Sequence, residues 1–228
     1  QRNVISPTNI DDMDLSELNT LRLLGGEPFV EKNFLKIFKT LKDKNVIQNV
    51  TLTVNTNNSI FPDDTWLSYL ELFKDLKIVL SLDAVGEHGE FIRKGLKFEK
   101  FKQNKKLWLE ISEVSFNSVL YNFSILGLHD LVDYVGLPVH YGVEGHDHAL
   151  DLSLGPYYLS LIHLPYQTKK MIEKYLNGRY DEILDFMYSQ DNDINYTNQY
   201  IIMFSYLNKS NKAPPECLKI YKSVMNAI

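Results

Sequence analysis

The chain has 228 residues, of which 44% are hydrophobic and 23% charged, which is enough apolar material for a folded core. Its 24 basic and 29 acidic residues give a formal net charge of -5, so a charge-driven nucleic-acid partner is not expected. No apolar run reaches the roughly 20 residues of a membrane helix, and the first residues are polar. The one cysteine, Cys217, cannot form an internal disulfide. We therefore expect a cytoplasmic protein without a membrane or nucleic-acid partner.

Short apolar or β-branched runs alternate with helical patterns through the first two thirds of the chain. The first run, 20–24, stops at two glycines, and apolar residues at helical spacing follow it over 31–44. Such alternation indicates parallel strands joined by helical crossovers. The expected strands are 20–24, 49–54, 77–83, 106–114 and 135–141; the expected helices are 31–44, one that Asp63 or Asp64 caps, 87–104, and one that carries Leu120, Phe123 and Leu131.

The pattern predicts the fold class as well as the elements. The run Ile78-Val79-Leu80 is continuously apolar, as in strands that are covered on both faces. After about Asp151 the alternation stops, and helices or turns are expected over 156–179, 180–189 and 197–208, with a last helix starting at Pro214-Pro215. We predict an α/β fold: a partial (β/α)6, TIM-like barrel of parallel strands over 1–150 and a helical C-terminal extension over 151–228.

Ligands of such sheets bind at the carboxyl ends of the strands, so the turns that follow the strands are the candidate sites. Gly25-Gly26-Glu27-Pro28 is the most informative of these turns. The glycines allow a ligand to approach the backbone, Glu27 offers a carboxylate that can hold an ammonium group, and Pro28 fixes the entry into the next helix. The alternative is a glycine turn with a capping glutamate. The other turns are 55–59, 81–87 and 112–117.

Three segments in order resemble a known family. GGEPFVEKNF, TVNTNNS and LSLDAVGEHGEFIRKG are similar to the radical S-adenosylmethionine (radical SAM) superfamily, especially to members with a twitch-type C-terminal extension. The resemblance covers about 21–117 and continues weakly in GPYYLSLIHLPYQTKKMIEKYL. It implies a site for S-adenosylmethionine whose methionyl end is lined by Gly25, Gly26, Glu27 and Pro28.

The third expected strand adds further candidate residues. Ser81 and Asp83 are two positions apart and therefore share a face, opposite Leu80 and Leu82. The resemblance implies that Ser81 contacts the methionyl carboxylate and that Arg93 supplies its counter-charge. A solvated helix charge is the alternative for Arg93.

Three asparagines complete the candidate set. Asn55 and Asn57 follow the second expected strand and either face the cavity or form the turn. Asn117 resembles an asparagine that recurs after the next strand in the family, and no role is assigned to it.

The family also holds a 4Fe-4S cluster on a C-x-x-x-C-x-x-C loop upstream of the GGEP turn. This sequence has no cysteine there, and Cys217 alone cannot supply the thiolates that a cluster needs. Either the cluster loop lies in a segment before Gln1, which the non-methionine start favours, or the chain is a degenerate member without a cluster.

The resemblance implies an enzyme, provided that the missing segment carries the cluster loop. Such enzymes cleave S-adenosylmethionine to a 5'-deoxyadenosyl radical that abstracts hydrogen from a substrate, here an unknown small molecule or peptide, with a donor such as flavodoxin or ferredoxin supplying the electron. The alternative is a cluster-less barrel that acts as a non-catalytic binding or assembly protein. A phosphate-binding barrel enzyme is a third option, but a glycine-rich anion loop near the last strands is absent.

Two other patterns favour ordinary structure. Gly145-His146-Asp147-His148, with His140 nearby, has metal-binding side chains, but this pattern is more typical of an exposed polar loop, and no metal site is predicted. Five lysines over 97–106 indicate a solvated helix face.

Overall fold

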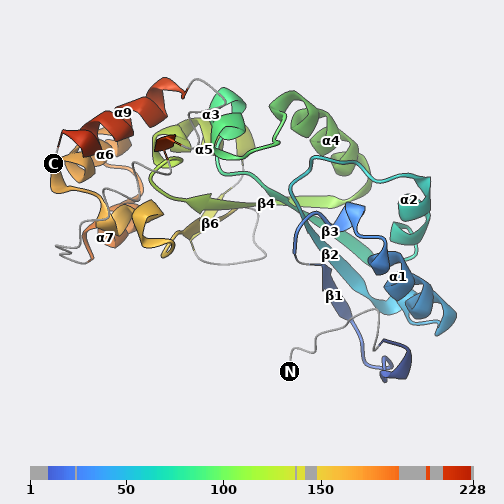
Figure 1. Cartoon of the computed structure of the whole chain (residues 1–228). Coiled ribbons are helices and arrows are strands. Elements are labelled where there is room, and N and C mark those ends of the chain that lie inside the picture. The colour runs from blue at the N-terminus through green and yellow to red at the C-terminus, as the bar shows by residue number, and fades with distance from the viewer. Residues whose placement is uncertain are drawn as a thin grey trace. The chain divides into compact units, whose positions relative to one another are not determined.

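The fold is described by a computed structural model, which covers residues 10–23, 25–136, 138–141, 148–189, 204–205 and 213–226. Its strands form a six-stranded sheet in the order β1-β2-β3-β4-β6-β5 (Figure 1). The pairs β1–β2, β2–β3, β4–β6 and β5–β6 are parallel, which confirms the predicted α/β class with parallel strands. The strands are β1 (Thr20–Leu23), β2 (Thr51–Thr56), β3 (Asp75–Ser81), β4 (Glu113–Leu120), β5 (Val139–Tyr141) and β6 (His148–Leu152).

The chain divides into two compact units, which are described separately. Unit 1 comprises 1–81 and 100–115, and unit 2 comprises 82–99 and 116–228. Unit 1 therefore contains β1, β2 and β3, and unit 2 contains β5 and β6. The predicted division at residue 150 stays a prediction; that residue lies within β6.

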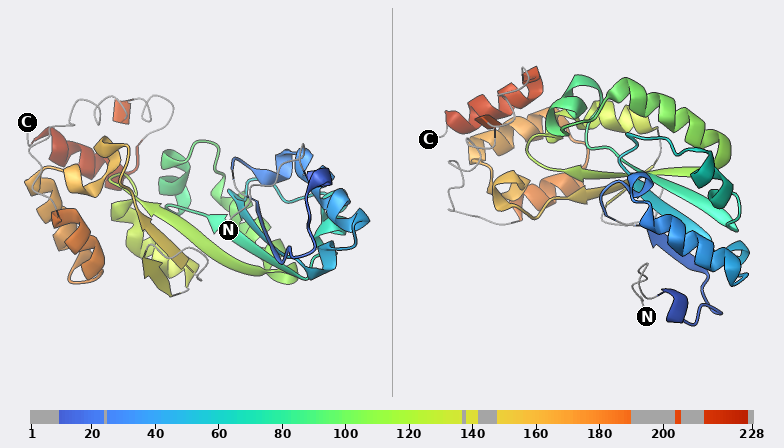
Figure 2. Two further views of the ribbon diagram at one scale, coloured as in Figure 1. Left: turned by 90° about the horizontal axis from the view of Figure 1, so that it is seen from below. Right: turned by 45° about the vertical axis from the view of Figure 1, so that its right-hand side comes forward.

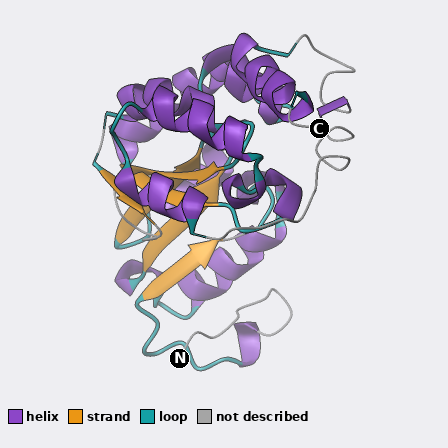
Figure 3. Cartoon of the chain, turned by 90° about the vertical axis from the view of Figure 1, so that its left-hand side faces the viewer, coloured by secondary structure: helices purple, strands orange, loops and turns teal. Residues whose placement is uncertain are grey.

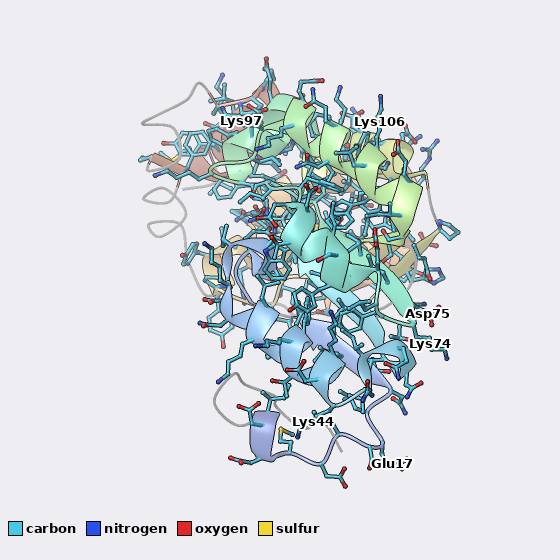
Figure 4. The ribbon with its side chains drawn as sticks, turned by 90° about the vertical axis from the view of Figure 1, so that its right-hand side faces the viewer. Glu17, Lys44, Lys74, Asp75, Lys97 and Lys106 are labelled. Carbon is cyan, nitrogen blue, oxygen red and sulfur yellow. The ribbon has the colours of Figure 1, made fainter. Side chains whose placement is uncertain are left out.

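In unit 1 the helices cover one face of the strands. Leu52, Val54 and Thr56 alternate along β2 and are buried, whereas the residues between them are half-buried. Figures 2 and 4 show the helices of this unit side by side on that face, and the rings of Phe29 and Trp66 meet there with centroids 5.3 Å apart. The helices are α1 (Asn33–Asp43), α2 (Asp64–Leu70) and most of α4 (Phe98–Ile111).

Unit 2 has an apolar core of its own. Leu120, Phe123, Ile172 and Cys217 are among its buried residues. The described residues after β6 are helices and loops, which confirms the predicted helical C-terminal extension (Figure 3), and Pro215 occupies the first position of the last helix, as expected. The helices are α3 (Gly86–Ile92), α5 (Leu128–Val135), α6 (Tyr166–Leu176), α7 (Asp181–Tyr188) and α9 (Pro215–Met225).

Between β3 and β4 the structure corrects the sequence-based assignment. The single helix predicted over 87–104 is wrong, because α3 ends at Ile92 and Gly95 adopts a φ of 93°, which interrupts a helix. The strand predicted over 106–114 is also wrong, since 106–111 belong to α4 and the strand runs from Glu113 to Leu120. The turn predicted over 112–117 therefore lies at the beginning of β4 and not after a strand.

Predictions in unit 2 change as well. The helix expected to carry Leu120, Phe123 and Leu131 is wrong in its first part, because Leu120 ends β4 and the helix that contains Leu131 begins at Leu128. The fifth strand, expected over 135–141, covers only Val139–Tyr141, because Val135 still belongs to α5 and Gly136 ends that helix in the left-handed region with a φ of 66°. The sequence did not predict β6. The helix or turn expected over 197–208 lies outside the described residues except for 204–205. None of the described helices is both long enough and apolar enough to cross a membrane.

Candidate functional site

The GGEP turn begins just after β1. Gly25 has a φ of 125°, a conformation that favours glycine. A Cβ atom at Gly25 or Gly26 would meet no atom within 4 Å among the residues that the structure describes, chain neighbours aside. Pro28 starts a short 3-10 helix, Pro28–Val30, and Glu27 caps it. The backbone of both glycines is thus open to a ligand at the carboxyl end of the strand.

Three uncharged donors hold the carboxylate of Glu27. The Thr56 hydroxyl lies 2.9 Å from Oε1 and 2.8 Å from Oε2, the Asn57 amide donates to Oε2 at 3.0 Å, and the Phe29 amide donates to Oε1 at 3.4 Å. No ion-pair partner of Glu27 occurs among the residues that the structure describes. The carboxylate is therefore fixed at the ends of β1 and β2 while its charge is left uncompensated there.

The pKa of Glu27 reflects this arrangement. Burial raises the pKa of this carboxyl, and the hydrogen bonds from Thr56, Phe29 and Asn57 partly offset the rise. A cationic group placed beside Glu27 would favour its ionised form. The geometry suits an ammonium group as a ligand.

The two asparagines at the end of β2 have different partners. Arg22 donates from Nε and Nη2 to Asn55 Oδ1, both at 3.2 Å. Asn57 Oδ1 accepts from the Ser59 amide at 2.9 Å, which is the hydrogen bond of a turn-forming asparagine. The turn alternative therefore describes the Asn57 side chain, and Asn55 is joined to β1.

Sequence reasoning missed Arg22 and Thr56. The signal for Thr56 was present, since the two-residue period of β2 places it on the buried face with Leu52 and Val54. A hydroxyl buried at a strand end needs a hydrogen-bond partner. For Arg22 only the register, which pairs it with Thr53, indicates that its side chain shares a face with Asn55.

In unit 2, Asp83 has a charged partner. Its Oδ1 accepts from the Val119 amide at 2.9 Å, and its Oδ2 lies 3.4 Å from Nε of Arg93. The side chains of Asp83 and Arg93 are 11% and 34% exposed. Arg93 is thus the counter-ion of a nearly buried carboxylate. Ser81 ends β3 in unit 1 and is half-buried.

The structure therefore assembles the predicted residues in two groups, one in each unit. Gly25, Gly26, Glu27 and Pro28 meet the end of β2 in unit 1, and Asp83 meets Arg93 in unit 2. Their roles toward S-adenosylmethionine stay predictions. Asn117 lies within β4, and its buried Oδ1 has no hydrogen-bond partner among the described residues.

The histidines of the expected polar loop fall in different places. His148 starts β6, is fully buried, and lies 2.9 Å from the Ser118 hydroxyl through Nε2, so the exposed-loop interpretation is wrong for this residue. Burial lowers the pKa of His148 to about 4. His140 is half-buried in β5, and His146 lies outside the described residues. Within the described part of the chain, no three or more His, Cys, Asp or Glu side chains could together hold a metal ion.

Cys217 does not fit a cluster. It is fully buried in α9, with Sγ 3.5 Å from the carbonyl oxygen of Phe123, and burial raises the pKa of its thiol to about 12. Iron is bound by thiolates, of which a 4Fe-4S cluster needs several. The single thiol of this sequence therefore supplies no 4Fe-4S site.

A cavity of about 400 Å³ in unit 1 is separate from the GGEP turn. It lies between α2, α4 and the start of β3. Asp75 lies at the amino end of β3, opposite to the carboxyl ends where Glu27 is held, and in Figure 4 the labelled Lys74 and Asp75 mark this edge. The lining residues are Phe61, Leu67, Leu70, Glu71, Phe73, Lys74, Asp75, Leu76, Leu107, Glu110 and Ile111.

Comparisons with known proteins show the fold. No protein-family model matches the sequence, and no curated protein matches it. Native anSMEcpe with bound AdoMet is similar in structure, with 18% identity, a TM-score of 0.50 and coverage of 87% of this chain and 57% of that chain. The same protein with AdoMet and Cp18Cys peptide gives 18% identity, a TM-score of 0.49 and coverage of 84% and 55%. Streptococcus suis SuiB bound to S-adenosylmethionine gives 16% identity and a TM-score of 0.46, with coverage of 86% of this chain and 44% of that chain. This chain thus spans little more than half of the anSMEcpe chain.

Proposed function

We propose that this chain binds S-adenosylmethionine at the GGEP turn as part of a radical SAM enzyme. The observation that carries the proposal is the Glu27 carboxylate, which neutral donors hold at the carboxyl ends of β1 and β2 and whose charge no described side chain balances. The fold shared with anSMEcpe, whose structure contains AdoMet, supports it. The substrate class we propose is a small molecule or peptide, with a flavodoxin or ferredoxin as electron donor.

The residues of unit 1 would hold the methionyl end of the cofactor. Glu27 would accept hydrogen bonds from the ammonium group, because its oxygens retain acceptor capacity beyond their present donors. Gly25 and Gly26 would let the ligand approach the backbone, since in the described part of the chain only their own neighbours lie within 4 Å of a Cβ position there. In the superfamily the bound cofactor is the source of a 5'-deoxyadenosyl radical. One buried thiol does not fit the cluster that forms this radical, so the residues of unit 1 would only bind and orient the cofactor.

Calorimetry with S-adenosylmethionine tests the proposal. Glu27→Ala removes the carboxylate, and we expect binding to weaken by about 1–3 kcal/mol because a charge-assisted hydrogen bond is lost. Glu27→Gln keeps the shape and one acceptor and should lose less.

Glu31→Ala is the matched control. Glu31 is also a turn glutamate, whose Oε1 accepts from the Asn33 amide at 3.0 Å, but it is exposed and has no place in the site. It should bind S-adenosylmethionine like the wild type. Equal affinity of the wild type, Glu27→Ala and Glu27→Gln, with circular dichroism showing intact folds, would contradict the proposal.

A non-catalytic binding or assembly protein is the second candidate. The state of Cys217, buried and with a pKa raised to about 12, favours it. We expect the 228-residue protein to take up no iron on anaerobic reconstitution. Near-stoichiometric iron and sulfide, with a charge-transfer absorption band, would reverse that expectation. Retained binding of S-adenosylmethionine without iron supports a binding role for this chain.

A further inference from the structure

The hydroxyl of Thr56 forms hydrogen bonds with two residues, Glu27 and Asn58. It donates to the Glu27 carboxylate, and its oxygen accepts from the Asn58 amide at 2.9 Å. Thr56 is 1% exposed, so water does not compete for these bonds. A buried hydroxyl that donates to a carboxylate and accepts from an amide has a fixed orientation, because its one hydrogen is committed.

Asn58 is in turn held by α4. Its Nδ2 donates to the carbonyl oxygen of Phe101 at 2.8 Å, and its Oδ1 accepts from Nε1 of Trp108 at 3.1 Å. Its own carbonyl oxygen accepts from Nδ2 of Asn104 at 2.9 Å. The residue is fully buried and adopts a φ of 59°, a left-handed conformation that asparagine tolerates better than most residues. Three hydrogen bonds thus fix the loop after β2 to one helix.

A second set of contacts, through Trp108 and Phe29, connects the same helix to Glu27. The ring of Trp108 stacks on Phe29, with centroids 5.3 Å apart and planes inclined by 29°. Phe29 is two residues after Glu27 and donates its amide to that carboxylate. Two of the three neutral donors to Glu27, the Thr56 hydroxyl and the Phe29 amide, are therefore supported by α4 through buried side chains.

We infer that Thr56 is a positioning residue that fixes the carboxylate of Glu27 for a cationic ligand group, and that Asn58, bound to α4, fixes Thr56. This inference rests on the proposed function of Glu27. It assigns to α4 the support of the site, although α4 contributes no residue to the GGEP turn.

The carboxyl carbon of Glu27 reports the arrangement directly. In the 228-residue protein labelled with ¹³C-glutamate, the Glu27 signal is assigned with Glu27→Gln and titrated. Thr56→Val should raise the pKa of Glu27 above the wild-type value, because a donor to the ionised form is lost. Thr56→Ser keeps the hydroxyl and should restore the wild-type pKa. In calorimetry Thr56→Val should bind S-adenosylmethionine about tenfold more weakly.

Thr53→Val is the matched control within β2. Thr53 lies on the opposite face of the strand, so its loss should change neither the titration nor the binding. Asn58→Gly, which accommodates the positive φ and releases Thr56 from α4, gives a second test if Thr56→Val does not fold. It should raise the Glu27 pKa less than Thr56→Val.

The outcomes separate this inference from the proposed function. An unchanged Glu27 pKa in folded Thr56→Val, or in Asn58→Gly when Thr56→Val does not fold, overturns the positioning role. A shifted pKa with unchanged S-adenosylmethionine affinity, while Glu27→Ala weakens binding, also overturns it. If Glu27→Ala itself leaves binding unchanged, the proposed function fails, whereas a shifted pKa would still support Thr56 as the residue that holds the carboxylate.

Discussion

Each unit holds a carboxylate at a candidate site, half-buried Glu27 in unit 1 and buried Asp83 in unit 2, and the two are held in opposite ways. Glu27 in unit 1 is bound by a hydroxyl and two backbone amides, and its charge stays uncompensated among the described residues. Asp83 in unit 2 is bound by the Val119 amide and by Arg93, so its charge is neutralised within the unit. A carboxylate that already has a guanidinium partner is a completed structural pair, whereas one held by neutral dipoles can still gain from a cation.

The largest expected effect is the difference in unfolding free energy that two Gly→Ala substitutions, one in each unit, should cause. A Cβ atom at Gly89 of α3 would clash with the carbonyl oxygen of Ala84, whereas one at Gly26 would meet no atom of the described residues within 4 Å beyond its chain neighbours. Gly89→Ala should therefore lower the free energy of unfolding by at least about 3 kcal/mol, and Gly26→Ala by less than about 0.5 kcal/mol. Urea unfolding measures both. Similar losses in the two variants would show that the glycines do not differ in packing.

The next largest effect is a loss of unfolding free energy in acid, to which His148 of unit 2 and Glu27 of unit 1 contribute with opposite sign. Because burial lowers the pKa of His148 from 6.5 to about 4, the folded protein binds this proton less readily than the unfolded chain. Neutral His148 therefore contributes to the free energy of unfolding in full above pH 6.5. This contribution is lost as the pH falls toward 4, and the total loss is about 3 kcal/mol. Glu27 acts in the opposite direction, since its raised pKa makes it stabilise less as the pH rises. Urea unfolding at pH 7 and pH 4.5 measures the loss.

His148→Phe is the control for this pH effect. It removes the titrating ring, and the Ser118 hydroxyl keeps the carbonyl oxygen of Leu82 as its acceptor. The variant should lose less stability between pH 7 and 4.5 than the wild type. An equal loss in both proteins would exclude His148 as the cause.

The smallest expected losses of unfolding free energy come from breaking one ion pair in each unit. Asp83→Ala removes a nearly buried carboxylate and leaves Arg93 and the Val119 amide without it, which should cost about 2 kcal/mol of unfolding free energy. Glu113→Ala breaks a pair with Lys77 at 3.0 Å whose side chains are 62% and 46% exposed, and should cost less than about 0.5 kcal/mol. Denaturation of both variants in urea is the measurement. A loss for Glu113→Ala as large as that for Asp83→Ala would remove the distinction.

Much of the fold followed from local patterns. The predicted strands at 20–24 and 49–54, the helix over 31–44 and the helix capped at Asp63 are confirmed, because their periodicity and caps are encoded over a few residues. The glycines and Glu27 of the candidate site were proposed from the sequence, and their roles stay predictions. Thr56 and Asn58 were not, because their partners lie 29 and 43 to 50 residues away in the chain.

What the sequence by itself determined is the parallel α/β class and a carboxylate in a glycine turn after the first strand. What the tertiary structure decided is clearest in α4. The run Leu107-Trp108-Leu109 is apolar enough to suggest a strand, yet no β-branched residue occurs over 98–110. Phe101, Asn104 and Trp108 form the buried face of a helix, while Leu107 and Leu109 are exposed. Hydrogen bonds from that face to Asn58 select the helix, and a contact between such distant residues leaves no periodic signal in the sequence.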